Sequence, residues 1–330
     1  MTRALVLEGG GARGAFQAGV LLYLADHPRR FRPDLVCGTS VGALNAAAFA
    51  FGLVPELVAT WCRLLPRHVY RRRSVLRHAA ALLLERRFTH LYDTTPLRRL
   101  LESVFGARTL RESPILLRIT AFNVQTGRPE VLDGEAPVRV VDALLASTAV
   151  QGLFPPVELG GFQYLDGANG SNLPLLPALE KGATDVLLLR AARREPLTPW
   201  PYRDVVSLQK RAHLSLMARL TRSDLSRARE VTTALRRHEA RMGRVRLAAE
   251  ELRDPEERAR FLRLCEGAPP LLPGRREVRL RVISPPRGGP VPDLLDFDPA
   301  TSLRLLRLGY AEARRRFARA GRKGESHVRS

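Results

Sequence analysis

One serine among small residues is the feature of this sequence that could most directly do chemistry. Ser40 is the centre of a G-x-S-x-G sequence, where small residues permit a sharp turn from strand to helix that lifts the hydroxyl above a sheet. A hydroxyl held there is suited to nucleophilic attack, whereas the alternative is that Ser40 only caps the helix that follows. The other residues of this expected nucleophile elbow are Gly38, Thr39, Val41 and Gly42.

A glycine-rich loop precedes the elbow by one strand and one helix. Glycines let main-chain N–H groups approach a ligand closely, and the helix that follows adds the positive end of its dipole, so the loop is expected to bind negative charge. The loop also matches the dinucleotide pattern G-x-G-x-x-G, but that site needs an acidic residue at the end of the second strand, and Asp34 opens this strand instead. The loop residues are Gly9, Gly10, Gly11, Ala12, Arg13 and Gly14.

An aspartate in a tight turn supplies a candidate base. Asp166 follows an apolar run and precedes Gly167 and Ala168. A serine nucleophile needs a base to take its proton, and an aspartate fixed at the end of a strand can be held rigidly for that task. Asp-Gly is also a common turn dipeptide, so this motif indicates a base only together with the other two.

The elements around these motifs indicate an α/β fold. Strand and helix signals alternate at the start, with strands at 4–7 and 34–37 and helices at 15–24 and 41–51, and such β-α units favour a mostly parallel sheet covered by helices. Further strands are expected at 115–123, 130–132, 162–165, 185–189 and 278–283, and further helices at 140–149 and 299–318. Helical insertions without strands are expected at 63–101 and 202–264, and linkers at 267–275 and 284–293.

The three motifs together resemble those of the patatin-like phospholipases, in which a glycine loop, a G-x-S-x-G elbow and a D-G-A/G motif follow in this order. Further similarity lies in Leu145 to Ala149, Phe154 to Val157, and Asn172 to Pro174, and more weakly in residues 293–318. One departure is Ala149-Val150-Gln151-Gly152, where a proline is more usual, and there a local change of the loop is expected.

The resemblance implies a three-layer α/β/α fold and a serine acyl hydrolase that cleaves carboxylic esters of lipids. It assigns Ser40 as the nucleophile, Asp166 as its base in a Ser–Asp dyad, and the loop of residues 9–14 as the oxyanion hole. Its amide donors are expected from Gly10, Gly11 and Ala12, whereas Arg13 is expected to order the loop or face solvent. No cofactor and no metal are required. The substrate is expected to be a phospholipid, a lysophospholipid or another ester, and oligomeric state is left open.

A Ser-Asp-His triad is a competing hydrolase design with the same elbow. Its histidine would follow the acid, which leaves His213, His238 and His327. The first two lie in arginine-rich helical sequence and the third in the tail, so solvated positions are expected for all three. None lies in a loop after a late strand, as the triad requires.

Residues 1–200 are expected to form the catalytic core and residues 201–275 an arginine-rich helical insertion. Residues 276–330 would complete the core with a strand, a helix and a basic tail. No apolar stretch reaches the roughly 20 residues of a membrane-spanning helix, and no signal peptide is visible. Cys37, Cys62 and Cys265 lack metal or redox spacing and are expected to be reduced and mostly buried, so a cytoplasmic location is expected.

The formal net charge of +21 is the one extreme property of the composition. Such a field attracts anionic surfaces, and peripheral contact with the inner face of a membrane is the expected consequence for an enzyme of lipids. The alternative is a basic adaptor with a degenerate hydrolase core that binds membranes or nucleic acid. No aromatic-interleaved basic motif of a nucleic-acid module is visible, so no nucleic-acid partner is expected.

Overall fold

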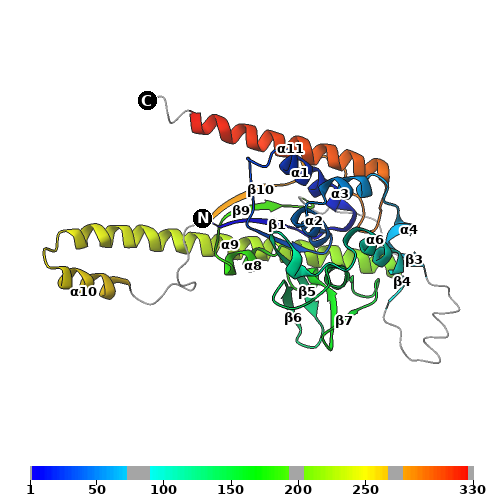
Figure 1. The fold of residues 1–330 in the computed structure, drawn as a ribbon, viewed down its shortest axis with the longest axis horizontal. Coiled ribbons are helices and arrows are strands. Elements are labelled where there is room, and N and C mark those ends of the chain that lie inside the picture. Colours follow the sequence, from blue (N-terminus) through cyan, green and yellow to red (C-terminus); the bar gives the residue numbers. More distant parts are fainter. Residues whose placement is uncertain (1, 73–89, 193–203, 267–277, 326–330) are drawn as a thin grey trace.

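The computed structural model describes residues 2–72, 90–192, 204–266 and 278–325, and it builds them around one mixed sheet (Figure 1). The strand order is β10-β9-β1-β2-β5-β8-β7, and β6 pairs with β5. The pairs among the first five strands of this order are parallel, whereas β6, β7 and β8 pair in antiparallel fashion. The strands are β1 (Thr2–Leu7), β2 (Leu35–Thr39), β5 (Leu116–Asn123), β6 (Arg128–Leu132), β7 (Val157–Leu159), β8 (Phe162–Asp166), β9 (Ala183–Leu189) and β10 (Arg279–Ile283).

The central strands are apolar at successive positions because both faces of the sheet are covered. In β1, Leu5 and Leu7 belong to the core on one face, and Ala4 and Val6 belong to the core on the other. The first face carries α1 (Gly14–Asp26), α2 (Val41–Ala50), α3 (Val54–Trp61), α4 (Pro66–Val69), α6 (Thr95–Phe105), α7 (Val140–Ser147) and α11 (Pro299–Glu325). The second face carries α8 (Leu175–Glu180) and α9 (Val205–Glu250).

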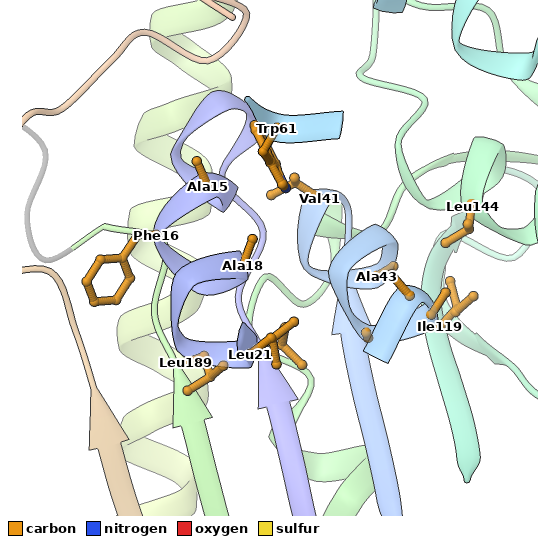
Figure 2. Close-up of a cluster of buried hydrophobic side chains, with 14 of the residues drawn as sticks. Ala15, Phe16, Ala18, Leu21, Val41, Ala43, Trp61, Ile119, Leu144 and Leu189 are labelled. Carbon is orange, nitrogen blue, oxygen red and sulfur yellow. The ribbon is translucent and has the colours of Figure 1, made fainter. Parts of the chain in front are cut away.

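The core on the first face fixes α1 and α2 over the sheet. Figure 2 shows Phe16 and Leu21 of α1 and Ala43 of α2 in one buried cluster, which also contains Leu189 of β9 and Ile119 of β5. These side chains are fully buried, and burying one large apolar side chain stabilises a fold by about 1.5–3 kcal/mol. The two helices that begin immediately after the chemical motifs are therefore held rigidly against the sheet.

Helix α9 on the second face has 46 residues and extends beyond the sheet (Figure 1). The first part of α9 packs on α8 and on η4 (Gly167–Asn169), and its buried side chains include Ala228 and Leu235. Its last part extends away from the sheet and is accompanied by α10 (Pro255–Glu266) (Figure 1). The described part of the expected insertion thus combines a section packed on the core, up to Leu235, with a projecting arm, which is residues 236–250 of α9.

The expected mostly parallel sheet flanked by helices is confirmed. The strand expected at 115–123 begins one residue later, at Leu116, and the strand expected at 185–189 begins two residues earlier, at Ala183. The prediction of no strands within residues 63–101 is wrong, because β3 (Arg71–Arg72) and β4 (Tyr92–Asp93) form an antiparallel pair. Each of these strands has only two residues, which is too short for an alternating pattern. The domain boundaries expected after residues 200 and 275, and the linker at 267–275, lie outside the described residues.

Candidate active site

Ser40 lies in a strained turn between the end of β2 and the start of α2. Its φ of 54° and ψ of −129° make it the only non-glycine with positive φ among the described residues. The Ser40 amide donates to Ser147 Oγ at 2.9 Å, and Ser147 Oγ donates to the Thr120 carbonyl at 2.7 Å. A Cβ on Gly42 would lie 2.5 Å from the Leu7 carbonyl oxygen, which is why this position of the elbow is glycine. The expected sharp turn between strand and helix is present.

The hydroxyl of Ser40 meets the carboxylate of Asp166 directly. Ser40 Oγ donates to Asp166 Oδ2 at 2.7 Å, although the two residues are 126 positions apart. The other carboxylate oxygen, Oδ1, accepts from the Ala168 amide at 2.8 Å, and the Asp166 amide donates to the Ala149 carbonyl at 2.8 Å. The Ala149 segment, where the family's usual proline is absent, therefore still anchors the aspartate.

Burial sets the acidity of this carboxyl group. Asp166 is fully buried, and desolvation raises its pKa from 3.8 to about 7, while the bonds from Ala168 and Ser40 oppose this rise. A base with a pKa near neutrality can take a proton and return it at physiological pH. This electrostatic setting suits general base catalysis.

The glycine loop offers two main-chain N–H groups that have no protein acceptor among the described residues. These belong to Gly10 and Gly11. The amides of the other four loop residues are occupied, and this corrects the expectation that Ala12 is an oxyanion donor. The acceptors are the carbonyls of Asn172 for Gly9, Leu294 for Ala12, Gly10 for Arg13 and Gly11 for Gly14.

Arg13 stabilises the loop through the segment that precedes α11. Its side chain is buried, and Nε donates to the Pro292 carbonyl at 2.9 Å. The neighbouring Leu294 carbonyl accepts from the Ala12 amide at 2.9 Å. The segment before α11 and the glycine loop therefore fix each other, and of the two expectations for Arg13 the structure supports loop ordering.

An apolar cavity of about 110 Å³ opens beside the serine. Ser40 and Gly11 line it together with the aliphatic and aromatic side chains of α2, α3 and α6, including Leu44, Trp61 and Phe105. Its one amide side chain, Asn45, is satisfied internally, because it accepts from Trp61 Nε1 and donates to the Gly14 carbonyl and Gln17 Oε1. The walls therefore suit an apolar chain better than a polar group.

Ser40 donates to Asp166 directly, and no histidine of the described residues lies between them. The expectation that His213 is solvated is wrong, because it is 4% exposed on the inner side of α9. Burial lowers its pKa to about 4, so it is neutral. His238 is half-buried, and His327 lies outside the described residues. Leu214 and Met217 lie on the same buried side of α9 as His213. These apolar neighbours could have indicated a buried position in the sequence, but the many arginines of the helix favoured a solvated one.

Within residues 2–72, 90–192, 204–266 and 278–325, no group of three or more histidine, cysteine, aspartate or glutamate side chains is arranged to hold a metal ion. In the same ranges no helix is long and apolar enough to cross a membrane. Cys37 is buried, whereas Cys62 and Cys265 are half-buried, and all three are free thiols.

Comparison with known proteins gives the family. The sequence model of the patatin-like phospholipases matches residues 5–179, more than half of the chain. The chain belongs to the patatin-like phospholipase family. The match includes the glycine loop, the elbow and the Asp166 turn, so the three motifs belong to one family domain. It ends before α9, which therefore lies outside the matched part of this patatin-like phospholipase.

Curated relatives of this patatin-like protein are similar over part of their length. Lysophospholipase NTE1 of Debaryomyces hansenii is 28% identical over 214 residues, which are 62% of this chain and 12% of that protein. The cGAMP-activated phospholipase of Escherichia coli is 29% identical over 174 residues, which are 47% of this chain and 48% of that protein. The chain therefore spans about half or less of the length of these two relatives.

Two solved structures also resemble the chain at low identity. Human GIVD cytosolic phospholipase A2 in complex with methyl γ-linolenyl fluorophosphonate has a TM-score of 0.46 and 13% identity, covering 97% of this chain and 58% of that chain. VipD from Legionella pneumophila has a TM-score of 0.44 and 14% identity, covering 96% of this chain and 67% of that chain.

Proposed function

We propose that this protein is a serine acyl hydrolase that cleaves carboxylic ester bonds of lipids. The observation that carries the proposal is the bond of 2.7 Å between Ser40 Oγ and the buried Asp166 carboxylate, at the wall of an apolar cavity. A nucleophile within hydrogen-bond reach of a base is the arrangement that acyl transfer requires. The alternative of an adaptor with a degenerate core is less well supported, because the whole arrangement is intact.

The proposed reaction is a two-step acyl transfer. Ser40 Oγ attacks the ester carbonyl carbon, its proton passes to Asp166, and the oxyanion of the tetrahedral intermediate accepts from the amides of Gly10 and Gly11. Collapse expels the alcohol, which takes the proton from Asp166 and leaves an acyl–Ser40 ester. Water then gives a proton to Asp166 and attacks this ester, and the fatty acid leaves as Ser40 regains its hydrogen. Each step uses Asp166 first as base and then as acid.

The cavity supports a lipid acyl chain as the group held beside Ser40. Leu44, Leu100 and Phe105 offer it no hydrogen bonds, and burying methylene groups there contributes about 0.8 kcal/mol each. Relatives named lysophospholipase and cGAMP-activated phospholipase support the same class of substrate. A long-chain ester is therefore expected to be cleaved with a higher kcat/KM than a short-chain ester of the same alcohol.

Labelling with a fluorophosphonate probe tests the proposed function. Such a probe forms a covalent bond with an activated serine, so wild-type protein should be labelled at Ser40, and Ser40→Ala should not be labelled. Ser226→Ala, at an exposed serine of α9 whose hydroxyl donates to Glu230, is the matched control and should be labelled like wild type. A panel of phospholipids, lysophospholipids and acyl esters then identifies the substrate. Equal labelling of wild-type and Ser40→Ala protein, or labelling of neither, would overturn the proposal.

We also propose that the projecting arm of α9 brings the enzyme to anionic membranes. Five exposed arginines lie within eleven residues of this arm, together with the exposed side chain of Leu247. A cluster of arginines attracts anionic lipid headgroups, each contributing on the order of 1 kcal/mol near the surface. The arginines are Arg236, Arg237, Arg241, Arg244 and Arg246.

Vesicle sedimentation measures this membrane contact. The protein should bind phosphatidylglycerol-containing vesicles more tightly than phosphatidylcholine vesicles, and binding should fall as NaCl rises from about 0.05 to 0.5 M, where screening shortens the reach of charges. Replacing Arg237, Arg244 and Arg246 by Gln should weaken vesicle binding about 100-fold, with hydrolysis of a soluble short-chain ester unchanged. Equal binding to both vesicle types would contradict the proposal, and tighter binding to duplex DNA would favour the adaptor.

A further inference from the structure

The residues that follow Asp166 connect the three parts of the proposed site. We call residues 170–173 the post-aspartate segment. The Ser171 amide donates to the Gly167 carbonyl at 2.9 Å, which ties the segment to the aspartate turn. The Ser171 carbonyl accepts from Thr39 Oγ1 at 3.0 Å, immediately before the nucleophile. The Asn172 carbonyl accepts from the Gly9 amide at 3.1 Å, at the start of the glycine loop.

The post-aspartate segment is in turn held by α9, on the far side from the cavity. Asp224 Oδ2 accepts from Ser171 Oγ at 3.2 Å and from the Leu173 amide at 3.1 Å. Thr221 Oγ1 accepts from Asn172 Nδ2 at 2.8 Å. Thr221 and Asp224 are three positions apart, so both point from one side of the helix toward the same segment.

Thr221 also reaches the glycine loop by a second route. Its hydroxyl donates to Glu8 Oε1 at 2.8 Å, and Glu8 Oε2 accepts from the Ala191 amide at 2.9 Å. Glu8 directly precedes the loop and forms an ion pair with Arg190 at 3.4 Å. Thr221, Asn172 and Glu8 are all buried, so the loss of the hydroxyl would leave a donor and a charged acceptor in the interior without this partner.

We propose that Thr221 and Asp224 are positioning residues of the active site, through which α9 fixes the glycine loop and the nucleophile turn against Asp166. This inference rests on the proposed acyl hydrolase function. Neither side chain lines the cavity beside Ser40, so neither touches substrate there. They act through Asn172, Ser171 and Glu8, which set the direction of the Gly10 and Gly11 amides and of Ser40. Displacement of such groups by about 1 Å can reduce a rate about 100-fold.

The chain offers a matched control for this role in the same helix. Thr232 is also a buried threonine of α9, but its hydroxyl donates to the Ala228 carbonyl within the helix and reaches no part of the site. Replacing either threonine by valine removes one hydroxyl at nearly constant volume. A purely structural role predicts comparable effects of Thr221→Val and Thr232→Val on turnover, whereas a positioning role predicts that they differ.

The experiment measures kcat, KM and the rate of fluorophosphonate labelling on the full chain. Thr221→Val should lower kcat and the labelling rate by about 10- to 100-fold with KM changed less than threefold, because the cavity is untouched. Thr221→Ser, which restores the hydroxyl, should recover most of the wild-type kcat, and Thr232→Val should match wild type. If Thr221→Val does not fold, Asp224→Ala against Asp224→Asn gives the same test at a half-buried position, because asparagine keeps an acceptor.

Two kinds of failure are distinguishable. Wild-type protein without ester hydrolysis and without labelling dependent on Ser40 would overturn the acyl hydrolase function itself. Active wild-type protein in which Thr221→Val and Asp224→Ala retain the kcat of Thr232→Val would overturn only the positioning role. A rise in KM with kcat unchanged would overturn it too, since that pattern reports lost substrate contact.

Discussion

Replacement of either member of the dyad, by Ser40→Ala or Asp166→Asn, is expected to reduce ester hydrolysis by about 10⁴-fold or more, as loss of a nucleophile or its acid partner does in serine hydrolases. The reason is geometric, since within the part of the chain that the structure describes Ser40 Oγ donates to one acceptor, Asp166 Oδ2, at 2.7 Å. Initial rates on a long-chain ester measure this loss. His213→Ala and His238→Ala are the controls, and a comparable loss in either would restore the triad hypothesis.

The activity of the wild-type protein should also depend on pH in the sense set by Asp166. A base acts only when ionised, and burial raises the pKa of Asp166 to about 7. The value of kcat/KM should therefore rise about tenfold per pH unit below this pKa and level off above it. A profile of kcat/KM between pH 5 and 9 measures the rise. A flat profile over this range would contradict the role of Asp166 as base.

The Asp166→Asn variant should be more stable against thermal unfolding than wild type, although it is inactive. The folded pKa of Asp166 lies above the unfolded value of 3.8, so the folded state binds more protons, and stability falls as pH rises from about 4 to about 7. Asp166→Asn removes this ionisation, so its melting temperature should exceed that of wild type by several degrees at pH 8 and by less at pH 5. The site thus holds its base at the expense of stability.

Asp204→Asn is the matched control for the stability measurement. Asp204 caps α9, and bonds from Ser207 hold its pKa below the usual value. Its linkage has the opposite sign, because a lowered pKa contributes stability above the unfolded value that is lost as pH falls. Asp204→Asn should therefore gain no stability at pH 8. A gain in both variants would mean that loss of one negative charge, rather than relief of a buried carboxylate, explains the result.

Local sequence patterns predicted the strands that are buried on both faces. Successive apolar residues in β1 and β9 indicate such strands, because helices cover both sides of the sheet there. The turn at Ser40 was also predictable, since its small neighbours permit a conformation that few other sequences allow. The contact between Ser40 and Asp166 was predicted from the family resemblance and not from a local pattern, because 126 positions separate the two residues.

The contacts that refine the site could not be predicted because their partners lie far apart in sequence. Ala12 was expected to hold the oxyanion, but its amide is used by the Leu294 carbonyl, and no local pattern shows this bond. Ser147, which satisfies the strained Ser40 amide, is an ordinary helix residue in the sequence. Thr221 and Asp224 lie in arginine-rich sequence that indicates a solvated helix, and only the packing of α9 on the sheet reveals their bonds.

The glycine loop gives the second large effect, because Gly11 has no room for a side chain. Its φ is +55°, and a Cβ there would lie 2.0 Å from the Leu294 carbonyl oxygen, a backbone atom. Gly11→Ala must therefore shift the loop, and with it the open amides of Gly10 and Gly11. Since loss of one oxyanion donor typically costs about 10²–10³ in kcat, we expect a decrease of at least that size.

Gly243→Ala is the control that separates this effect from the replacement of a glycine as such. Gly243 lies in the exposed arm of α9, and a Cβ there meets no atom within 4 Å, so alanine should leave kcat unchanged and favour the helix by up to about 1 kcal/mol. Steady-state kinetics and thermal melts of both variants measure this. A folded Gly11→Ala protein that kept more than one tenth of the wild-type kcat would mean that the amides of this loop do not hold the oxyanion, and the donors would then have to be sought at the first turn of α2, next to Ser40.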